Sequence, residues 1–175
     1  FWTPDVTGGA KADKSYSATQ STPGYDVTLV LGEAVTGMAG LEIGAGYSKF
    51  DQVQSGLGDA SDSTVYATYA IGGLTLGYQW SEADLGTTTG AQQYDNDGYG
   101  ITFAINDDLS VGYNHYESEQ TNATNVTNEA SSLQIAYSMG GASIRLAEGR
   151  SDNQDYNSGA TYDRDNTILS VSLAF

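Results

Sequence analysis

The feature that most constrains the fold is a strict alternation of apolar and polar residues over segments of about ten residues. In the last segment Leu169, Val171 and Leu173 fall on one face, while Ser170 and Ser172 fall on the other. A two-residue period is that of a β-strand and not of a helix. The same pattern recurs along the chain and predicts nine strands, at residues 25–34, 40–50, 63–71, 74–83, 98–105, 109–118, 130–139, 142–150 and 164–175.

The connections between these segments alternate between short and long. Short links rich in Gly, Asn and Asp, such as Gly72-Gly73 and Gly140-Gly141, suit hairpin turns because these residues accept positive φ angles. The other links are long and polar, at residues 51–62, 84–97, 119–129 and 151–163. Short turns at one end of the strands and long loops at the other are typical of transmembrane β-barrels, in which the turns are periplasmic and the loops extracellular.

Composition separates this chain from ordinary soluble proteins. Only 16% of the residues are charged although the net charge is −16, and the chain holds 22 Gly and 13 Tyr. A soluble acidic protein normally carries more Lys and Glu. No apolar run approaches the roughly 20 residues of a transmembrane helix, so any membrane crossing must use strands. With six Lys and Arg in all, nucleic acid is excluded as a partner.

The sequence therefore predicts an all-β fold, a transmembrane antiparallel up-and-down β-barrel of the outer membrane. Residues 1–24 are expected to form an extracellular loop or the end of a preceding strand, and residues 25–175 the barrel strands. A soluble β-sandwich also alternates apolar with polar residues. The predicted strands are longer than the usual five or six residues of soluble sheets, and Lys-rich or Pro-rich edge protection is missing, which favours the barrel.

Aromatic residues near the ends of the apolar face predict a girdle at the membrane interfaces. Its expected members are Tyr47, Tyr69, Tyr78, Trp80, Tyr99, Tyr113 and Tyr137. The opposite face is small and polar, and its larger side chains are the expected pore-lining residues Glu42, Tyr66, Gln79, Asn114, Tyr116, Gln134 and Arg145. Such a wall suits a lumen filled by water.

Nine strands conflict with the even strand number of single-chain bacterial barrels. One resolution is that further strands precede residue 1. The other is a complete eight-stranded barrel over residues 40–175 that serves as an adhesin, receptor or structural anchor without transport. An eight-stranded barrel is filled by its inward side chains, so the small inward residues favour the wider barrel.

Several features together resemble the trimeric, 16-stranded general porins of alphaproteobacteria over residues 25–175. They are the glycine-tyrosine pairs of the strands, the Gly-Gly turns, the acidic loops, and the terminal Leu173-Ala174-Phe175. The resemblance implies strands eight to sixteen of such a porin, a homotrimer, and passive diffusion of small hydrophilic solutes. It also implies that Leu173 and Phe175 belong to the signal read by the outer-membrane assembly machinery, although Ile168 and Ser170 depart from its usual pattern.

Charge predicts the remaining properties. Acidic residues around the pore mouth should concentrate cations, which predicts a weak cation preference. The acidic loops are expected to contact lipopolysaccharide and could offer Ca²⁺ ligands at Asp95, Asp97 and Asp155, although solvated loops explain the same residues. No other metal or cofactor is expected.

The single histidine does not predict an enzyme. His115 falls on the apolar face near the extracellular end, and its spacing to Ser118 does not suit a nucleophile and base. We therefore expect His115 to lie at the membrane interface or at a contact between subunits, and we expect no catalytic residue.

Overall fold

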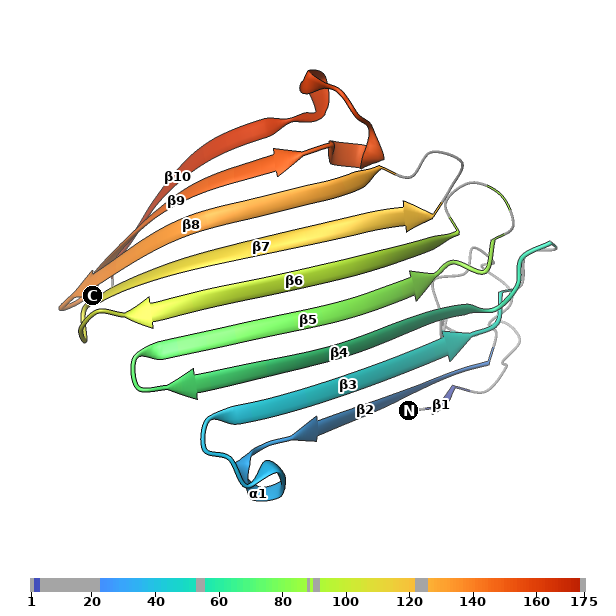
Figure 1. Ribbon diagram of the computed structural model, residues 1–175, viewed down its shortest axis with the longest axis horizontal. Coiled ribbons are helices and arrows are strands. Elements are labelled where there is room, and N and C mark those ends of the chain that lie inside the picture. Colours follow the sequence, from blue (N-terminus) through green and yellow to red (C-terminus); the bar gives the residue numbers. More distant parts are fainter. Residues whose placement is uncertain are drawn as a thin grey trace.

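The computed structural model describes residues 2–3, 23–52, 56–87, 89, 92–121 and 126–173, the first two through their backbone alone. The described strands form one antiparallel sheet in which each strand pairs with the next along the chain (Figure 1). The strands are β1 (Trp2–Thr3), β2 (Gly24–Leu31), β3 (Leu41–Phe50), β4 (Ala60–Ile71), β5 (Leu74–Asp84), β6 (Gln93–Ala104), β7 (Leu109–Thr121), β8 (Thr127–Met139), β9 (Ala142–Asp152) and β10 (Arg164–Leu173). Nine of them are long, as the alternation predicts.

The sheet is a single layer without a hydrophobic core. Among the described side chains the only buried hydrophobic residue is Ala60, which is 5% exposed. Large apolar residues such as Leu169 (67% exposed) lie open on one face. A β-sandwich would bury these residues between two sheets. The β-sandwich alternative is therefore wrong, because the described strands form one sheet that has no second sheet packed on it.

Most strands run further toward the loop end than the alternation predicts. Strand β4 begins at Ala60 rather than at residue 63, β6 begins at Gln93 rather than at 98, and β7 ends at Thr121 rather than at 118. In these extensions polar residues occupy both faces, so the apolar signal is lost. The backbone hydrogen bonds continue nonetheless, because the ladder does not depend on side-chain polarity.

The first predicted strand is wrong at its turn end. It was expected to reach Ala34, but β2 ends at Leu31 and a short helix, α1 (Glu33–Thr36), follows. The backbone N–H groups of Val35 and Thr36 both donate to the Gly32 carbonyl at 3.0 Å. Gly37, with φ +67°, then closes the turn by donating its N–H to Glu33, which suits a glycine C-cap.

The short turns gather at one end of the sheet and the long links at the other (Figure 1). Gly72 and Gly140 begin the two Gly-Gly turns with φ of +57° and +59°, the left-handed conformation that glycine accepts most readily. In the third short turn the Asn106 side-chain oxygen accepts the N–H groups of Asp108 and Leu109, each at 2.9 Å. The predicted asymmetry of the connections is therefore present.

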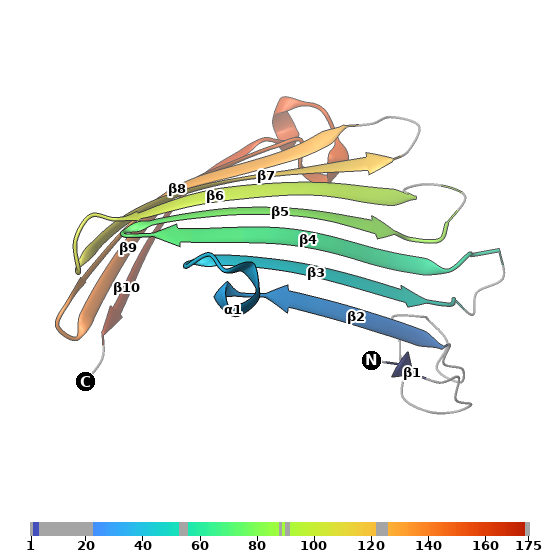
Figure 2. The ribbon, with the colours of Figure 1, turned by 60° about the horizontal axis from the view of Figure 1, so that its bottom comes forward.

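The sheet is bent and open (Figure 2). Within the described part of the chain β10 pairs with β9 alone, and β1 lies at the other edge. An eight-stranded barrel over residues 40–175 would need β3 to pair with β10, whereas β3 pairs with β2 and β4. That alternative is wrong for this sheet. No helix among the described residues has the length and apolar character to cross a membrane.

Candidate functional site

The strand register divides the side chains between two faces of different chemistry. Cross-strand partners share a face, and successive residues of a strand alternate between faces. On one face Ile101 of β6 lies between Leu76 and Tyr113. On the other face the next residue, Thr102, lies between Thr75 and Gly112.

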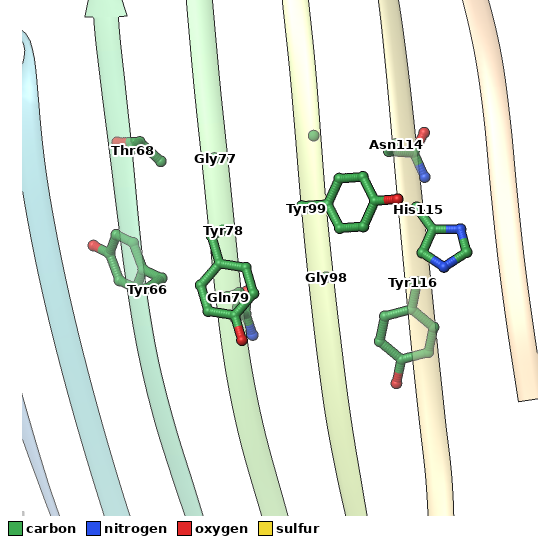
Figure 3. A pocket seen from close by; sticks show the side chains of 11 residues that line it. Tyr66, Thr68, Gly77, Tyr78, Gln79, Gly98, Tyr99, Asn114, His115 and Tyr116 are labelled. Carbon is green, nitrogen blue, oxygen red and sulfur yellow. The ribbon is translucent and has the colours of Figure 1, made fainter. Parts of the chain in front are cut away.

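The polar face is the hollowed one. Three shallow hollows, of about 360, 330 and 220 Å³, are lined mainly by its residues. We call it the concave face and the apolar one the outward face. Figure 3 shows the two faces at the largest hollow, with Tyr66 and Tyr116 on one side of the strands and Tyr78, Tyr99 and His115 on the other.

All seven residues expected to line a pore lie on the concave face. They are Glu42, Tyr66, Gln79, Asn114, Tyr116, Gln134 and Arg145. The register adds three charged residues that sequence reasoning missed, because they lie near strand ends where the alternation fades. Asp26 and Asp62 share this face through Ser48, and Arg164 shares it as the partner of Ser151.

The two large tyrosines of the concave face are fixed by hydrogen bonds. The Tyr66 hydroxyl donates to Glu42 Oε1 at 2.8 Å, and the Tyr116 hydroxyl donates to Asn96 Oδ1 at 2.6 Å. The Tyr66 ring lies over Gly44, where an added Cβ would be 2.1 Å from its Cε1 atom, so only glycine leaves room for it. Between the two rings the wall of the largest hollow is lined by Gly77, Gly98 and Gly100.

The middle of the concave face is uncharged. The described residues that β5, β6, β7 and β8 present there are Gly, Ala, Ser, Thr, Asn, Gln and Tyr. Charges on this face belong to the outer strands: Asp26, Glu42 and Asp62 on β2 to β4, and Arg145 and Arg164 on β9 and β10. Neutral hydrogen-bonding groups therefore dominate the central wall.

The outward face has an apolar band that ends in aromatic side chains on the loop side. The last apolar residue before the polar strand end is Tyr25 on β2, Tyr47 on β3, Trp80 on β5, Tyr99 on β6 and Tyr113 on β7. Of the other expected girdle residues, Tyr69 and Tyr137 lie near the turn end and Tyr78 lies beside Trp80 in the band. Tyr25 was not expected, because it opens a strand with little apolar alternation before it.

The loop-side border of the apolar band runs obliquely to the cross-strand rows. Following cross-strand partners from Leu169, the outward apolar residue of β10 nearest the loop end, leads strand by strand to Ile71 on β4. The corresponding apolar residue of β4 itself is Val65, which lies six residues nearer the loop end than Ile71. On β2 the border residue is Tyr25, whose cross-strand partners lead to Ser61 on β4, four residues nearer the loop end than Val65. The border thus descends by about 34 Å over eight strand spacings of about 38 Å, which corresponds to a strand tilt of roughly 40°. Transmembrane barrels have tilts of about 35–45°.

Above this border the outward face is acidic. Asp97, Glu117, Glu129 and Asp152 are consecutive cross-strand partners on β6 to β9. A second row contains Glu82, Asp95 and Glu119. Such acids were expected around a pore mouth, but the register places these seven on the outward face instead.

Neutral and basic neighbours moderate this acidic surface at several points. His115 Nε2 lies 2.8 Å from Glu117 Oε1, and Arg150 pairs with Asp152 at 2.9 Å. The Gln93 amide donates to both Glu82 and Asp95, at 2.9 and 3.0 Å. In the loop before β4, a hydrogen bond from Lys49 of β3 lowers the pKa of the Asp59 carboxyl.

The single histidine and two of the metal candidates, Asp95 and Asp97, lie on the outward face and so apart from the concave wall of the described strands. The His115 ring packs 5.1 Å from the Tyr99 ring, and no hydrogen bond joins it to Ser131, its cross-strand partner. Within the described chain no three His, Asp or Glu side chains gather closely enough to hold a metal ion. Ca²⁺ binding at Asp95, Asp97 or Asp155 stays a prediction.

Comparison with known proteins supports the fold. No protein-family model matches the chain, and no curated protein matches its sequence. Among solved structures 26 chains match. One is a porin refined at 1.8 Å resolution, with a TM-score of 0.66 and 17% sequence identity. The match covers 91% of this chain and 53% of the porin chain, so this chain spans about half the length of that porin. By its fold the chain is a sheet of nine long antiparallel up-and-down strands that matches half of a porin barrel.

Proposed function

We propose that the chain forms about half the wall of a water-filled pore in the bacterial outer membrane, through which small hydrophilic solutes and ions diffuse passively. The observation that carries this proposal is a single-layer sheet with an apolar outward face, a polar concave face and no core between them. In hydrocarbon a sheet must also close on itself to pair its edges. Further strands outside this sequence would close the edges at β1 and β10.

The outward face supports a membrane setting. Its aromatic border and the roughly 40° tilt match the geometry that transmembrane barrels need. The acidic rows above the border lie where lipid head groups replace hydrocarbon, so lipopolysaccharide is the proposed partner of this surface. Leu173 ends the last described strand, and Phe175 lies outside the described residues. Recognition of both by the assembly machinery remains part of the proposal.

Transport by diffusion requires no catalytic group, because pore radius and electric field control it. The proposal therefore assigns no enzyme activity. A weak cation preference is supported by the charged residues on the concave face of the strands, where the three acids Asp26, Glu42 and Asp62 outnumber the two bases Arg145 and Arg164. The acidic rows contribute less, since they lie on the other side of the wall.

A homotrimer is proposed from the resemblance to trimeric porins and from one asymmetry of the outward face. The loop-side border is aromatic on β2, β3, β5, β6 and β7, with Val65 on β4 as the exception, whereas on β8, β9 and β10 it consists of Leu133, Leu146 and Leu169. Aromatic residues favour contact with lipid head groups. Their absence supports burial of this part of the surface against a second subunit.

The test is single-channel recording of the full-length protein in planar bilayers. Stepwise currents and a reversal potential of cation sign in a salt gradient are expected. The control is the same preparation after heat denaturation. A folded, membrane-inserted barrel that gives no stepwise current would overturn the proposal and favour a non-transporting adhesin, receptor or anchor. Anion preference would overturn only the proposed selectivity.

A further inference from the structure

One connection folds back over the concave face instead of extending away from the strands. The link between β9 and β10, residues 153–163, contains the short turns η1 (Gln154–Tyr156) and η2 (Ala160–Tyr162) and lies beside the loop end of β8 (Figure 1). Asn153 Nδ2 donates to the Thr127 carbonyl of β8 at 2.9 Å. The side chain of Tyr156 reaches beyond β8 to two further strands.

Tyr156 makes specific contacts with the concave wall. Its hydroxyl lies 2.7 Å from Ser118 Oγ on β7, and its ring centroid lies 5.4 Å from that of Tyr94 on β6. Ser118 in turn donates to Asn96 Oδ1 at 2.5 Å, the atom that also accepts the Tyr116 hydroxyl. The link is thus joined to the hydrogen-bonded network that fixes the concave tyrosines.

Burial shows that the link covers part of the concave wall. Ser118 is 2% exposed and is the most buried side chain among the described residues. Asn114, four residues away on the same strand and face, is exposed. On a single-layer sheet a water-facing serine is shielded only if something covers it, and Tyr156 lies against it.

The backbone of the link is strained. Asn153, Asp155 and Tyr156 have φ of +57°, +56° and +55°. Asn and Asp tolerate this conformation, but it is a genuine outlier for a bulky residue such as Tyr. Strained conformations persist where surrounding contacts enforce them, and they concentrate at functional positions. The contacts of Tyr156 with Ser118 and Tyr94 supply that enforcement.

We propose that Tyr156 and the β9–β10 link narrow the mouth of the pore and set the size limit of the solutes that enter. This inference rests on the proposed function. From β9 to β6 the link covers three strand spacings, or roughly 14 Å of the concave wall. It therefore takes up space inside the lumen at its loop end.

The first test compares two tyrosines of the same link in the full-length protein. Tyr156→Ala should raise single-channel conductance and speed the entry of large neutral sugars into vesicles relative to small ones. Tyr162→Ala is the matched control, because Tyr162 is 37% exposed and lies in the same link. It should leave both properties unchanged. Equal conductance and equal sugar entry in the two variants would overturn the proposal.

A second test measures the cover directly and does not depend on conduction. The chain has no cysteine, so Ser118→Cys and the control Asn114→Cys each introduce one thiol for a water-soluble maleimide. The thiol at position 118 should react slowly and that at position 114 quickly. Adding Tyr156→Ala should speed the reaction at position 118 by about tenfold or more, since a ring pair and a hydrogen bond are lost. Equally fast reaction at both positions with Tyr156 present would overturn the proposal.

The two tests separate this inference from the proposed function. If the barrel conducts and the thiol at position 118 reacts freely, the proposed pore function stands and the proposed narrowing by Tyr156 is overturned. A barrel without current in which position 118 is shielded would show that the link is docked on a wall that does not conduct. That result would overturn both the proposed pore and the narrowing of its mouth.

Discussion

The two faces of β5 to β8 differ most at their loop ends. The outward face carries Glu82, Asp95, Asp97, Glu117, Glu119 and Glu129 there, whereas the concave face of the same described strands has no charged residue. Neighbouring residues of one strand therefore lie in different electrostatic surroundings. The net charge of −16 is therefore a poor guide to the field inside the proposed pore, because much of the acid lies outside the wall.

The largest expected effect is on the free energy of unfolding, which should respond differently to a charge on each of the two faces. Ile101→Arg places a charge in the apolar band and should cost roughly 2–4 kcal/mol, as Arg does on the lipid face of barrels. Thr102→Arg, one residue away on the concave face, should cost much less because water solvates it. Unfolding by urea in lipid vesicles measures both. Equal losses of unfolding free energy would show that the two faces meet the same environment.

A smaller effect concerns the acidic rows. Glu129 lies between Glu117 and Asp152 on neighbouring strands, and like charges placed opposite each other destabilise a sheet. Glu129→Gln should therefore stabilise the protein by about 0.2–1 kcal/mol at low salt, and the gain should fade at high salt. The control is Glu148→Gln, because Glu148 has Leu133 and Thr167 as partners. A gain that does not depend on salt would exclude charge repulsion as its cause.

The third prediction concerns selectivity. Glu42 lies on the concave face and Glu82 on the outward face. Glu42→Gln should reduce cation preference in reversal-potential measurements, whereas Glu82→Gln should change it little because the wall and its solvent screen that charge. The two variants remove the same charge, so a larger shift for Glu82→Gln would reverse the assignment of the faces.

The smallest expected effect depends on pH and probes the β9–β10 link, which covers part of the concave face. Burial raises the pKa of the Tyr156 hydroxyl, so docking favours the neutral phenol. Docking should be at full strength below the ordinary tyrosine pKa of about 10 and should weaken as the pH rises above it. Conductance should therefore increase in that range. Tyr156→Phe, which cannot ionise, should lack this increase, and an identical rise in both proteins would assign it to other groups.

The sequence predicted the strands and faces where one chemistry alternated with another. The period of two in the sequence assigns residues to the two faces, as it does for Leu133, Gln134, Ile135 and Ala136. The alternation disappears where both faces become polar, so the extensions of β6 and β7 and the outward position of Asp97 could not be read from it. Their faces follow only from the hydrogen-bonded register, which carries the alternation past the apolar band.

The docked link could not be predicted for a different reason. Tyr156 contacts Ser118, 38 residues away, and nothing in the local sequence 153–163 marks an inward fold. The strained φ angles of Asp155 and Tyr156 are visible only in three dimensions. A tyrosine in a polar loop was the available signal, and Tyr162, which is 37% exposed, shares that property.

A wall one residue thick has a consequence for how such a protein can change over time. In the proposed pore, every second side chain of the apolar band contacts lipid and the side chains between them contact water, so substitutions on the two faces are constrained by separate requirements. Solute preference can then be retuned through residues such as Gln79 and Asn114 while insertion into the bilayer is left untouched. In a globular enzyme, neighbouring side chains pack in one core, so substitutions there affect one another. In this wall, neighbouring residues of a strand lie on opposite faces and can be substituted independently.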